Sequence, residues 1–227
     1  MHTKGRVVLK TCYLALVAAA LATAVGCETA PYFRQRGLEL FVTGQYDSAE
    51  ERFTKAAEKD PSHWASHFYL GLIHLKKGRP LEAQLSLELA LSVHPADAQT
   101  PQILDALAEV LYRQNNEAAL HGLVAKACDD FGTIADFLRQ GKYLAKLGDA
   151  DNAKIAFRKA AHFAPKDDPT VYLAMADFFE SILDKDHAVM ALRRALFIHP
   201  TSAQIQQRLR SFGVIPGPTI MLPPDEE

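Results

Sequence analysis

Small and apolar residues recur along this chain at the spacing of a helix face. Ala49 and Ala56 stand seven residues apart with Phe53 between them, and mostly charged residues fill the intervening positions. This spacing places the three side chains on one stripe of an α-helix. Gly44 precedes the stretch, where a turn favours a residue that adopts positive φ, and Pro61 follows it and blocks continuation of the helix. The pattern predicts two antiparallel helices joined at Gly44.

The same order of residues returns at an interval of 34 residues. The first two units carry it as Gly37, Gly44, Ala49, Phe53, Ala56 and Pro61, and then as Gly71, Gly78, Ala83, Leu87, Ala90 and Pro95. A later unit has Gly141, Leu144, Gly148, Ala153, Phe157, Ala160 and Pro165, and a looser one has Ala176, Phe179, Ala188, Leu192, Ala195 and Pro200. Between these blocks, a degenerate unit at 100–131 has Ala108, Leu111, Leu120, Val124 and Ala127, with Asn115 and Asn116 in place of the turn glycine. The period indicates a repeat protein with five units.

Glycine and proline have defined roles in this pattern. Gly37 and Gly71 lie mid-way along the first helix of their units, where glycine costs about 1 kcal/mol relative to alanine. Close packing of the second helix against the missing side chain must offset that cost. Asp60 and Pro61 are predicted to begin the next helix, with Asp60 as N-cap and Pro61 as first residue.

The 34-residue period, with small residues where two helices touch and proline after the second, resembles the tetratricopeptide repeat. The resemblance covers residues 31–200 and implies an all-α, right-handed superhelical solenoid of about five helix pairs within 27–200. The last pair would expose an apolar face. We therefore predict a capping helix at 201–212, whose Ile205 and Leu209 lie on one side.

Residues 213–227 contain four prolines and are predicted to form an extended tail. Because Ile220, Met221 and Leu222 would be a poor free end, we expect the tail to dock at least partly on the solenoid. A self-associating protein, whose tail fills the groove of a neighbouring copy, stays open as an alternative.

The resemblance also implies a working surface, since the first helices of such repeats line the concave side of the solenoid. By the family's position pattern, the groove residues are Arg34, Leu38, Phe41, Phe68, Leu72, Leu75, Asp105, Glu109, Tyr112, Leu138, Lys142, Lys146, Leu173, Asp177 and Glu180. The first two repeats contribute mainly apolar side chains and the last three contribute many charged ones. Such a groove suits an extended peptide or a helix of a partner protein.

The first 26 residues have the features of an export signal. Lys4, Arg6 and Lys10 give a positive start, and an apolar run of about 15 residues follows, which is shorter than the roughly 20 residues of a spanning helix. Residues 24–27, Ala-Val-Gly-Cys, resemble a bacterial lipobox. That resemblance implies lipidation of Cys27 and a lipoprotein that faces the periplasm. A secretory signal cut near residues 22–24 and an uncleaved anchor remain as alternatives.

The net charge and the cysteines limit the kinds of partner and of covalent link that we expect. The formal net charge of −2, without a long basic run, argues against a nucleic-acid partner. Cys12 lies in the leader, so Cys128 is the one thiol of the mature chain besides Cys27 and no internal disulfide is expected. We interpret Cys128 as a small core residue.

Nine histidines raise the question of metal or acid–base chemistry. His63, His67 and His74 could share a helix face and support an alternative function as a metal-binding or enzymatic accessory protein. However, His67 and His74 occupy positions where the resemblance implies large core residues. No phosphate loop, nucleophile elbow or paired-cysteine motif occurs. We therefore expect no catalytic residue, metal, cofactor or small-molecule substrate. The leading hypothesis is a lipid-anchored scaffold of the bacterial envelope, similar in architecture to lipoproteins that help assemble envelope machines.

Overall fold

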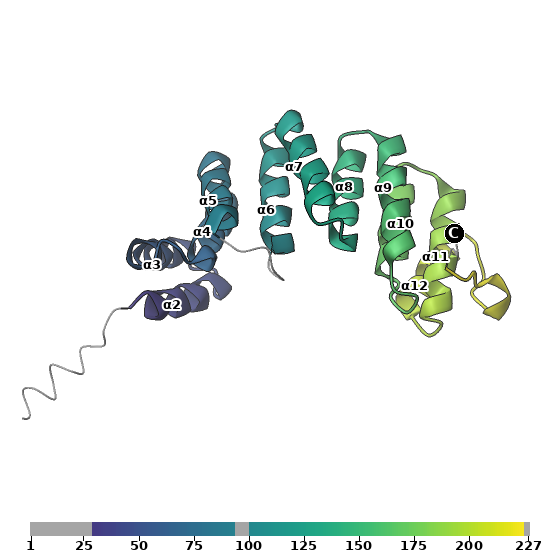
Figure 1. Cartoon of the computed structure of the whole chain (residues 1–227). Coiled ribbons are helices and arrows are strands. Elements are labelled where there is room, and N and C mark those ends of the chain that lie inside the picture. Colours follow the sequence, from purple (N-terminus) through teal and green to yellow (C-terminus); the bar gives the residue numbers. More distant parts are fainter. Residues whose placement is uncertain (1–28, 94–99, 225–227) are drawn as a thin grey trace, which may run out of the picture.

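The computed structural model describes residues 29–93 and 100–224, which form eleven α-helices, one 3₁₀-helix and no strand. The helices pair as α2 (Ala30–Val42) with α3 (Tyr46–Lys59), α4 (Trp64–Lys76) with α5 (Pro80–Val93), α6 (Thr100–Arg113) with α7 (Glu117–Asp130), α8 (Ile134–Lys146) with α9 (Ala150–Phe163) and α10 (Thr170–Ser181) with α11 (Lys185–Ile198), followed by α12 (Ala203–Ser211) and η1 (Pro218–Ile220). They stack in chain order (Figure 1). The predicted solenoid of five pairs with a capping helix is confirmed. The predicted leader and Cys27 lie outside the described residues.

Glycines in the first helices permit the close approach within each pair. A Cβ atom added at Gly71 would lie 2.5 Å from Cγ of Leu87, and one added at Gly37 would lie 2.9 Å from the ring of Phe53. Gly141 has the same relation to Phe157. The predicted role of these glycines is confirmed.

The turns between paired helices adopt positive φ, as predicted. Gly44, Gly78 and Gly148 have φ angles of 76°, 71° and 83°, and Asn115 takes the corresponding place in the third repeat with φ 54°. In the fifth repeat Leu183 occupies it with φ 61° and a side chain that is 91% exposed. A leucine in this conformation is unusual, and no feature of the sequence predicted it.

The predicted helix start at Asp60 and Pro61 is wrong. Helix α4 begins at Trp64, with His63 as its N-cap and a turn at residues 61–62. The Asp60 carboxylate accepts hydrogen bonds from the Arg34 guanidinium and the Ser62 hydroxyl, each at 3.0 Å. It is engaged in the loop and does not cap the helix.

The capping helix and the tail complete the core at the C-terminal end. Ile205 and Leu209 of α12 are buried in the apolar cluster formed by α8–α11. The tail docks on the same cluster through half-buried Ile220 and Met221. Arg193 of α11 donates a hydrogen bond to the carbonyl of Ile220. The expected partial docking of the tail is therefore confirmed for its described residues, which end at 224.

A carboxylate on α3 joins the first repeat to the second. Glu50 accepts hydrogen bonds from Lys77 at 2.8 Å and Arg79 at 2.7 Å, both beyond the end of α4. Burial alone would raise the pKa of Glu50, but the hydrogen bonds from Arg79 and Lys77 outweigh it and lower the pKa from 4.5 to about 2. The charged form is thus favoured by folding.

We predict that Glu50→Gln lowers the free energy of unfolding at pH 7 by about 1 kcal/mol, because the partly exposed ion pairs with Lys77 and Arg79 lose their carboxylate charge. Stabilisation by Glu50 is present above pH 4.5 and is lost as the pH falls through about 2. Urea denaturation between pH 7 and pH 2 should therefore show a smaller acid-induced loss in the variant. The control is Glu51→Gln, which removes an exposed ion pair with Lys55 on the same helix and should change the stability little. Equal pH profiles of the variant and the parent protein would contradict the prediction.

Candidate functional site

A groove of about 790 Å³ lies along the first helices of the last three repeats. Its lining comes mainly from α8 and α10, with Asp105 of α6 and the buried Phe157 of α9. The lining residues are Asp105, Ala135, Leu138, Arg139, Lys142, Ala145, Lys146, Phe157, Ala174, Asp177, Phe178, Ser181 and Ile182. Its volume lies within the range of small-molecule and peptide pockets.

Five of the predicted groove residues meet here. Leu138, Lys142 and Lys146 line the groove from α8, Asp105 lines it from α6 and Asp177 from α10. The structure adds an apolar surface from Phe178, Ile182 and Ala174 that the position pattern did not predict. The groove thus combines an apolar floor with charges of both signs.

Arg139 is the most important residue that the sequence analysis missed. Its side chain is only 1% exposed, and it pairs with Asp136, which is 2% exposed, and with Asp105, each at 2.7 Å. It also donates to the carbonyl of Pro101 at 3.1 Å. Asp105 and Arg139 stand 34 residues apart, so they occupy equivalent positions in successive first helices. Opposite charges one period apart were the signal that could have identified this pair.

Glu109 and Tyr143 repeat this relation one helical turn further along. The Tyr143 hydroxyl donates to Glu109 at 3.1 Å, again across 34 residues. Burial first, and then the neighbouring Glu109 carboxylate, raises the pKa of Tyr143. Lys146 pairs with Glu109 at 3.3 Å and lies 4.4 Å from the ring centroid of Tyr112. The predicted groove residues Glu109, Tyr112 and Lys146 therefore interact with one another.

Lys142 is different, because no carboxylate among the described residues pairs with it. Its ammonium lies 5.2 Å from the ring centroid of Tyr143 and is otherwise exposed at the groove. By contrast, Asp177 and Glu180 both accept from Arg208 of the capping helix at 2.7 Å. Lys142 is thus the charge in this groove that is left to interact with a ligand.

The predicted apolar half of the groove belongs largely to the core. Phe68, Leu72 and Leu75 are half-buried and pack on the cluster formed by α5–α8, and Leu173 packs on the α8–α12 cluster. Phe41 packs edge-on against Tyr69 at 5.3 Å between ring centroids. These side chains face neighbouring helices because consecutive first helices touch along this line. Arg34 is held by Asp60, and Leu38 remains 40% exposed.

Two of the three candidate histidines of the second repeat, His67 and His74, form hydrogen bonds within the protein. His67 is buried and its Nε2 lies 2.7 Å from the carbonyl oxygen of Pro61. His74 is buried between Glu50 and Ser86, at 3.3 Å and 3.2 Å. Within 29–93 and 100–224, no group of three or more histidine, cysteine, aspartate or glutamate side chains could hold a metal ion. The expected core positions of His67 and His74 are confirmed.

Cys128 is half-buried rather than fully buried. Its Sγ donates to Oε1 of Gln140 at 3.5 Å. Burial, followed by the effect of the Asp136 charge, raises the pKa of its thiol to about 11. A thiol with this pKa is a poor nucleophile near neutral pH, which agrees with a packing role.

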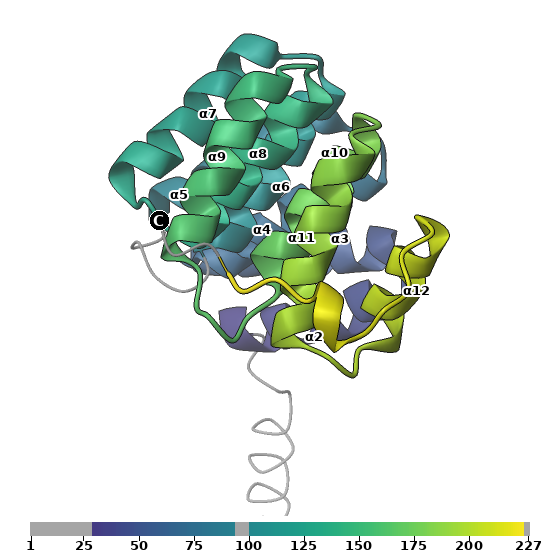
Figure 2. The same ribbon diagram turned by 90° about the vertical axis from the view of Figure 1, so that its right-hand side faces the viewer.

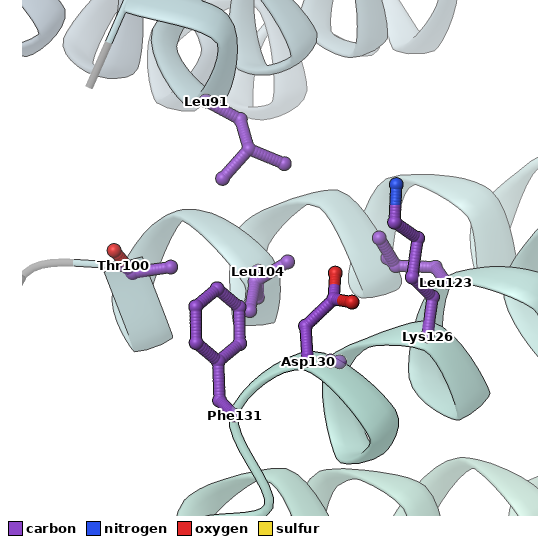
Figure 3. Close-up of a pocket in the computed structure, with 8 residues that line it drawn as sticks. Leu91, Thr100, Leu104, Leu123, Lys126, Asp130 and Phe131 are labelled. Carbon is purple, nitrogen blue, oxygen red and sulfur yellow. The ribbon is translucent and has the colours of Figure 1, made fainter. Parts of the chain in front are cut away.

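The boundary between the second and third repeats holds a smaller cavity of about 300 Å³. Figure 3 shows Leu91 of α5 pointing towards Leu104 of α6 and Phe131, with Lys126 and Asp130 of α7 at the edge. The sequence of the third repeat is degenerate, and its packing is irregular as well. The two helices of the third repeat contact each other less extensively than the helices of the other four pairs, and this cavity lies where the third repeat meets α5.

No helix in the described parts of the chain has the length and apolarity that crossing a bilayer requires. The leader lies outside those parts and is not covered by this finding.

The sequence of the repeats is similar to a known repeat family and to known proteins. Tetratricopeptide repeat models match residues 34–102 and 137–167. Anaphase-promoting complex subunit 3 of Schizosaccharomyces pombe is 22% identical over 156 residues, which are 68% of this chain and 23% of that protein. The chain spans about a quarter of the length of the curated relatives that it matches.

Solved structures share the fold. TTC0263, a thermophilic TPR protein of Thermus thermophilus, matches with a TM-score of 0.58 and 21% identity, covering 81% of this chain and 98% of that one. YrrB, a TPR protein with an unusual peptide-binding site, matches with a TM-score of 0.52 and 18% identity, covering 85% and 97%. The helix pairs, their spacing and these matches lead to one conclusion: residues 34–102 and 137–167 match the tetratricopeptide repeat, and the chain has the fold of solved tetratricopeptide repeat proteins.

Proposed function

We propose that this protein is a non-enzymatic scaffold that binds a segment of a partner protein in the groove of its last three repeats. The observation that carries the proposal is Lys142, an exposed cation without a carboxylate partner among the described residues, beside an apolar floor. YrrB, which has a similar fold, has a peptide-binding site, and that supports the same kind of role here.

The chemistry of the groove indicates what the segment looks like. The half-buried Leu138 and Ile182 offer apolar surface to a bulky side chain, and Lys142 offers its charge to an aspartate or glutamate of the partner. An extended peptide or one face of a helix can present both within a few residues. Asp105 and Asp177 are already paired with Arg139 and Arg208, so we expect them to shape the groove more than to bind.

Site-specific photo-crosslinking in cells tests this proposal. A photoreactive phenylalanine in place of Leu138 should form a discrete crosslinked product, and the same residue in place of Ile155, which is exposed on α9 outside the groove, should not. Adding Lys142→Glu should reduce the crosslink at 138 at least fivefold, because the partner's carboxylate would be repelled. Equal capture at both positions would reject the groove as the binding surface.

We further propose that the scaffold is held at the bacterial envelope through lipid on Cys27 and takes part in assembling an envelope machine there. Helix α2 begins at Ala30, three residues after Cys27, so at most about 10 Å of chain separates the lipid from the solenoid. Two or three acyl chains anchor stably where one is marginal. The repeats would then sit against the lipid headgroups.

Fractionation of a Cys27→Ser variant tests the anchor. We expect the parent protein in the membrane fraction with a processed N-terminus, and the variant in an unprocessed form that is released from membranes. Extraction with carbonate distinguishes lipid anchoring from peripheral binding. If the variant still fractionates with membranes after that wash, Cys27 is not the anchor.

A further inference from the structure

The turn between α10 and α11 holds Leu183 in a left-handed conformation. The backbone N–H of Asp184 donates to the carbonyl of Phe179 at 2.9 Å. The N–H of Leu183 donates to the carbonyl of Glu180 at 3.1 Å. Together these bonds form a motif that commonly ends α-helices and that needs positive φ at the residue in the place of Leu183, whose φ is 61°.

The other four helix pairs turn with the same two backbone hydrogen bonds, so the repeat architecture imposes positive φ at this position. Glycine or asparagine occupies the position in each of them, as Gly44, Gly78, Asn115 and Gly148. Both residue types adopt positive φ readily, whereas the Cβ atom of other residues lies too close to the backbone. The left-handed conformation of a leucine therefore lowers the ratio of folded to unfolded protein by roughly 5- to 30-fold.

The residue after Leu183 prevents the turn from relaxing. Asp184 is the N-cap of α11, and its side chain accepts a hydrogen bond from the backbone N–H of His187 at 3.3 Å. The same carboxylate lies 2.8 Å from Nδ1 of the His187 ring. A change of backbone conformation at Leu183 would move Asp184 and disturb the start of α11.

Burial of its side chain does not offset the cost of Leu183. The residue is 91% exposed, which is the highest value among the large apolar residues of 29–93 and 100–224. A leucine stabilises a fold by removing apolar surface from water, and Leu183 removes very little. A residue that is strained and also exposes apolar surface is best explained by a function outside the isolated fold.

Leu183 lies next to the groove of the last three repeats. The two residues that precede it, Ser181 and Ile182, line that groove, and Leu138 and Lys142 line it from α8. In Figure 2 the turn stands at the upper end of α10, whereas the yellow tail crosses the lower end of the pair. The turn thus presents an exposed apolar side chain beside the groove lining.

We propose that Leu183 contacts the partner segment that binds in this groove and receives an apolar side chain of that segment. The inference rests on the proposed function of the groove and adds a specificity-determining residue to it. The segment would carry an acidic residue for Lys142 and an apolar residue for the turn of the fifth repeat. Full burial of a leucine contributes roughly ten- to a hundredfold to an affinity, which offsets the cost of the left-handed conformation.

Leu183→Asn tests the inference, because Asn115 already occupies the equivalent turn. We expect the Tm to rise by about 2 °C, since asparagine adopts positive φ readily. The yield of the crosslink from photoreactive phenylalanine at position 138 should fall about fivefold or more, because the partner loses an apolar contact. Leu183→Met keeps an apolar side chain and the backbone strain, and it should leave the yield within about twofold of the parent value.

The matched control is Leu81→Asn, which removes a leucine that is 71% exposed on α5 outside the groove. Its crosslink yield at position 138 should stay within about twofold of the parent value. Photoreactive phenylalanine in place of Leu183 should give a product of the same mass as the one from position 138. A product at 138 without one at 183 would contradict a direct contact.

The outcomes separate this inference from the proposed function. If the parent protein gives the product at position 138 and Leu183→Asn gives it in equal yield, the groove binds a partner and Leu183 does not take part. Equal losses of yield in Leu183→Asn and Leu81→Asn, or a lower Tm in Leu183→Asn, would also overturn the inference. If the parent protein gives no product at 138, the proposed function fails and this inference fails with it.

Discussion

Arg139→Met is expected to lower the free energy of unfolding by about 3–5 kcal/mol, because it leaves a buried carboxylate without its cation. Asp136 is 2% exposed and loses the guanidinium that lies 2.7 Å away. Its remaining hydrogen bonds come from the backbone N–H and hydroxyl of Thr133. Asp105 is 63% exposed and can be hydrated when the cation is removed, so it contributes little to the loss.

Urea denaturation followed by circular dichroism measures this effect, and two further variants interpret it. Arg36→Met removes a surface arginine that pairs with Glu39 and should cost less than about 0.5 kcal/mol. Asp136→Asn in the Arg139→Met background should recover part of the stability, because the buried charge is gone while the contact with Thr133 remains. A loss below about 1 kcal/mol for Arg139→Met, or no recovery in the double variant, would contradict the buried-charge explanation.

Gly71→Ala is expected to lower the free energy of unfolding by about 2 kcal/mol, although alanine is the better helix former by about 1 kcal/mol. The added methyl group would lie 2.5 Å from Cγ of Leu87 and 3.3 Å from the carbonyl oxygen of Ala83, which is backbone and cannot rotate away. Helices α4 and α5 would have to separate, and the packing of the second repeat would loosen.

The matched control is Gly122→Ala on the exposed face of α7, where an added methyl group meets no atom within 4 Å. That substitution should raise the free energy of unfolding by about 0.5–1 kcal/mol. The two glycine-to-alanine substitutions should therefore change the stability in opposite directions. In a Leu87→Ala background the cost of Gly71→Ala should largely vanish because the clashing side chain is absent. Destabilisation by Gly71→Ala that persists in full in that background would show that the contact with Leu87 is not its cause.

The two substitutions, Arg139→Met and Gly71→Ala, are expected to reduce stability at different levels of the repeat architecture. Gly71 governs packing inside one helix pair, whereas Arg139 connects the third repeat to the fourth and also lines the groove. Mutations at Arg139 should therefore alter partner binding as well as stability. Lys142→Glu, which removes no contact to a carboxylate within the described residues, should affect binding alone.

Much of the fold followed from local physics that a sequence displays. Helix faces appear as three- and four-residue spacing, turns appear as glycine or asparagine, and helix ends appear as proline, so the five pairs and the capping helix could be predicted. The start of α4 could not, because Asp60 had two possible hydrogen-bonding roles. Asp60 is held by the nearby Ser62 and by Arg34, and Arg34 becomes a neighbour of Asp60 only after folding.

The site was predictable only in part. Position in the repeat identified Asp105, Leu138, Lys142 and Asp177 as residues along one groove, because equivalent positions in successive helices line up. Whether each charge is free or paired depends on side chains from other helices. Arg208 reaches Asp177 from the capping helix, and such a contact has no regular sequence spacing.

By itself, the sequence determined the period, the pairing of the helices and the residues that allow paired helices to touch, since these depend on neighbours within one or two repeats. The tertiary structure alone decided which apolar residues of the first helices are buried against adjacent repeats, which charges neutralise one another, and where the tail docks. Apart from pairs that stand one period apart, such as Asp105 and Arg139, those outcomes depend on distances between segments that lie far apart in the chain and that periodicity does not specify.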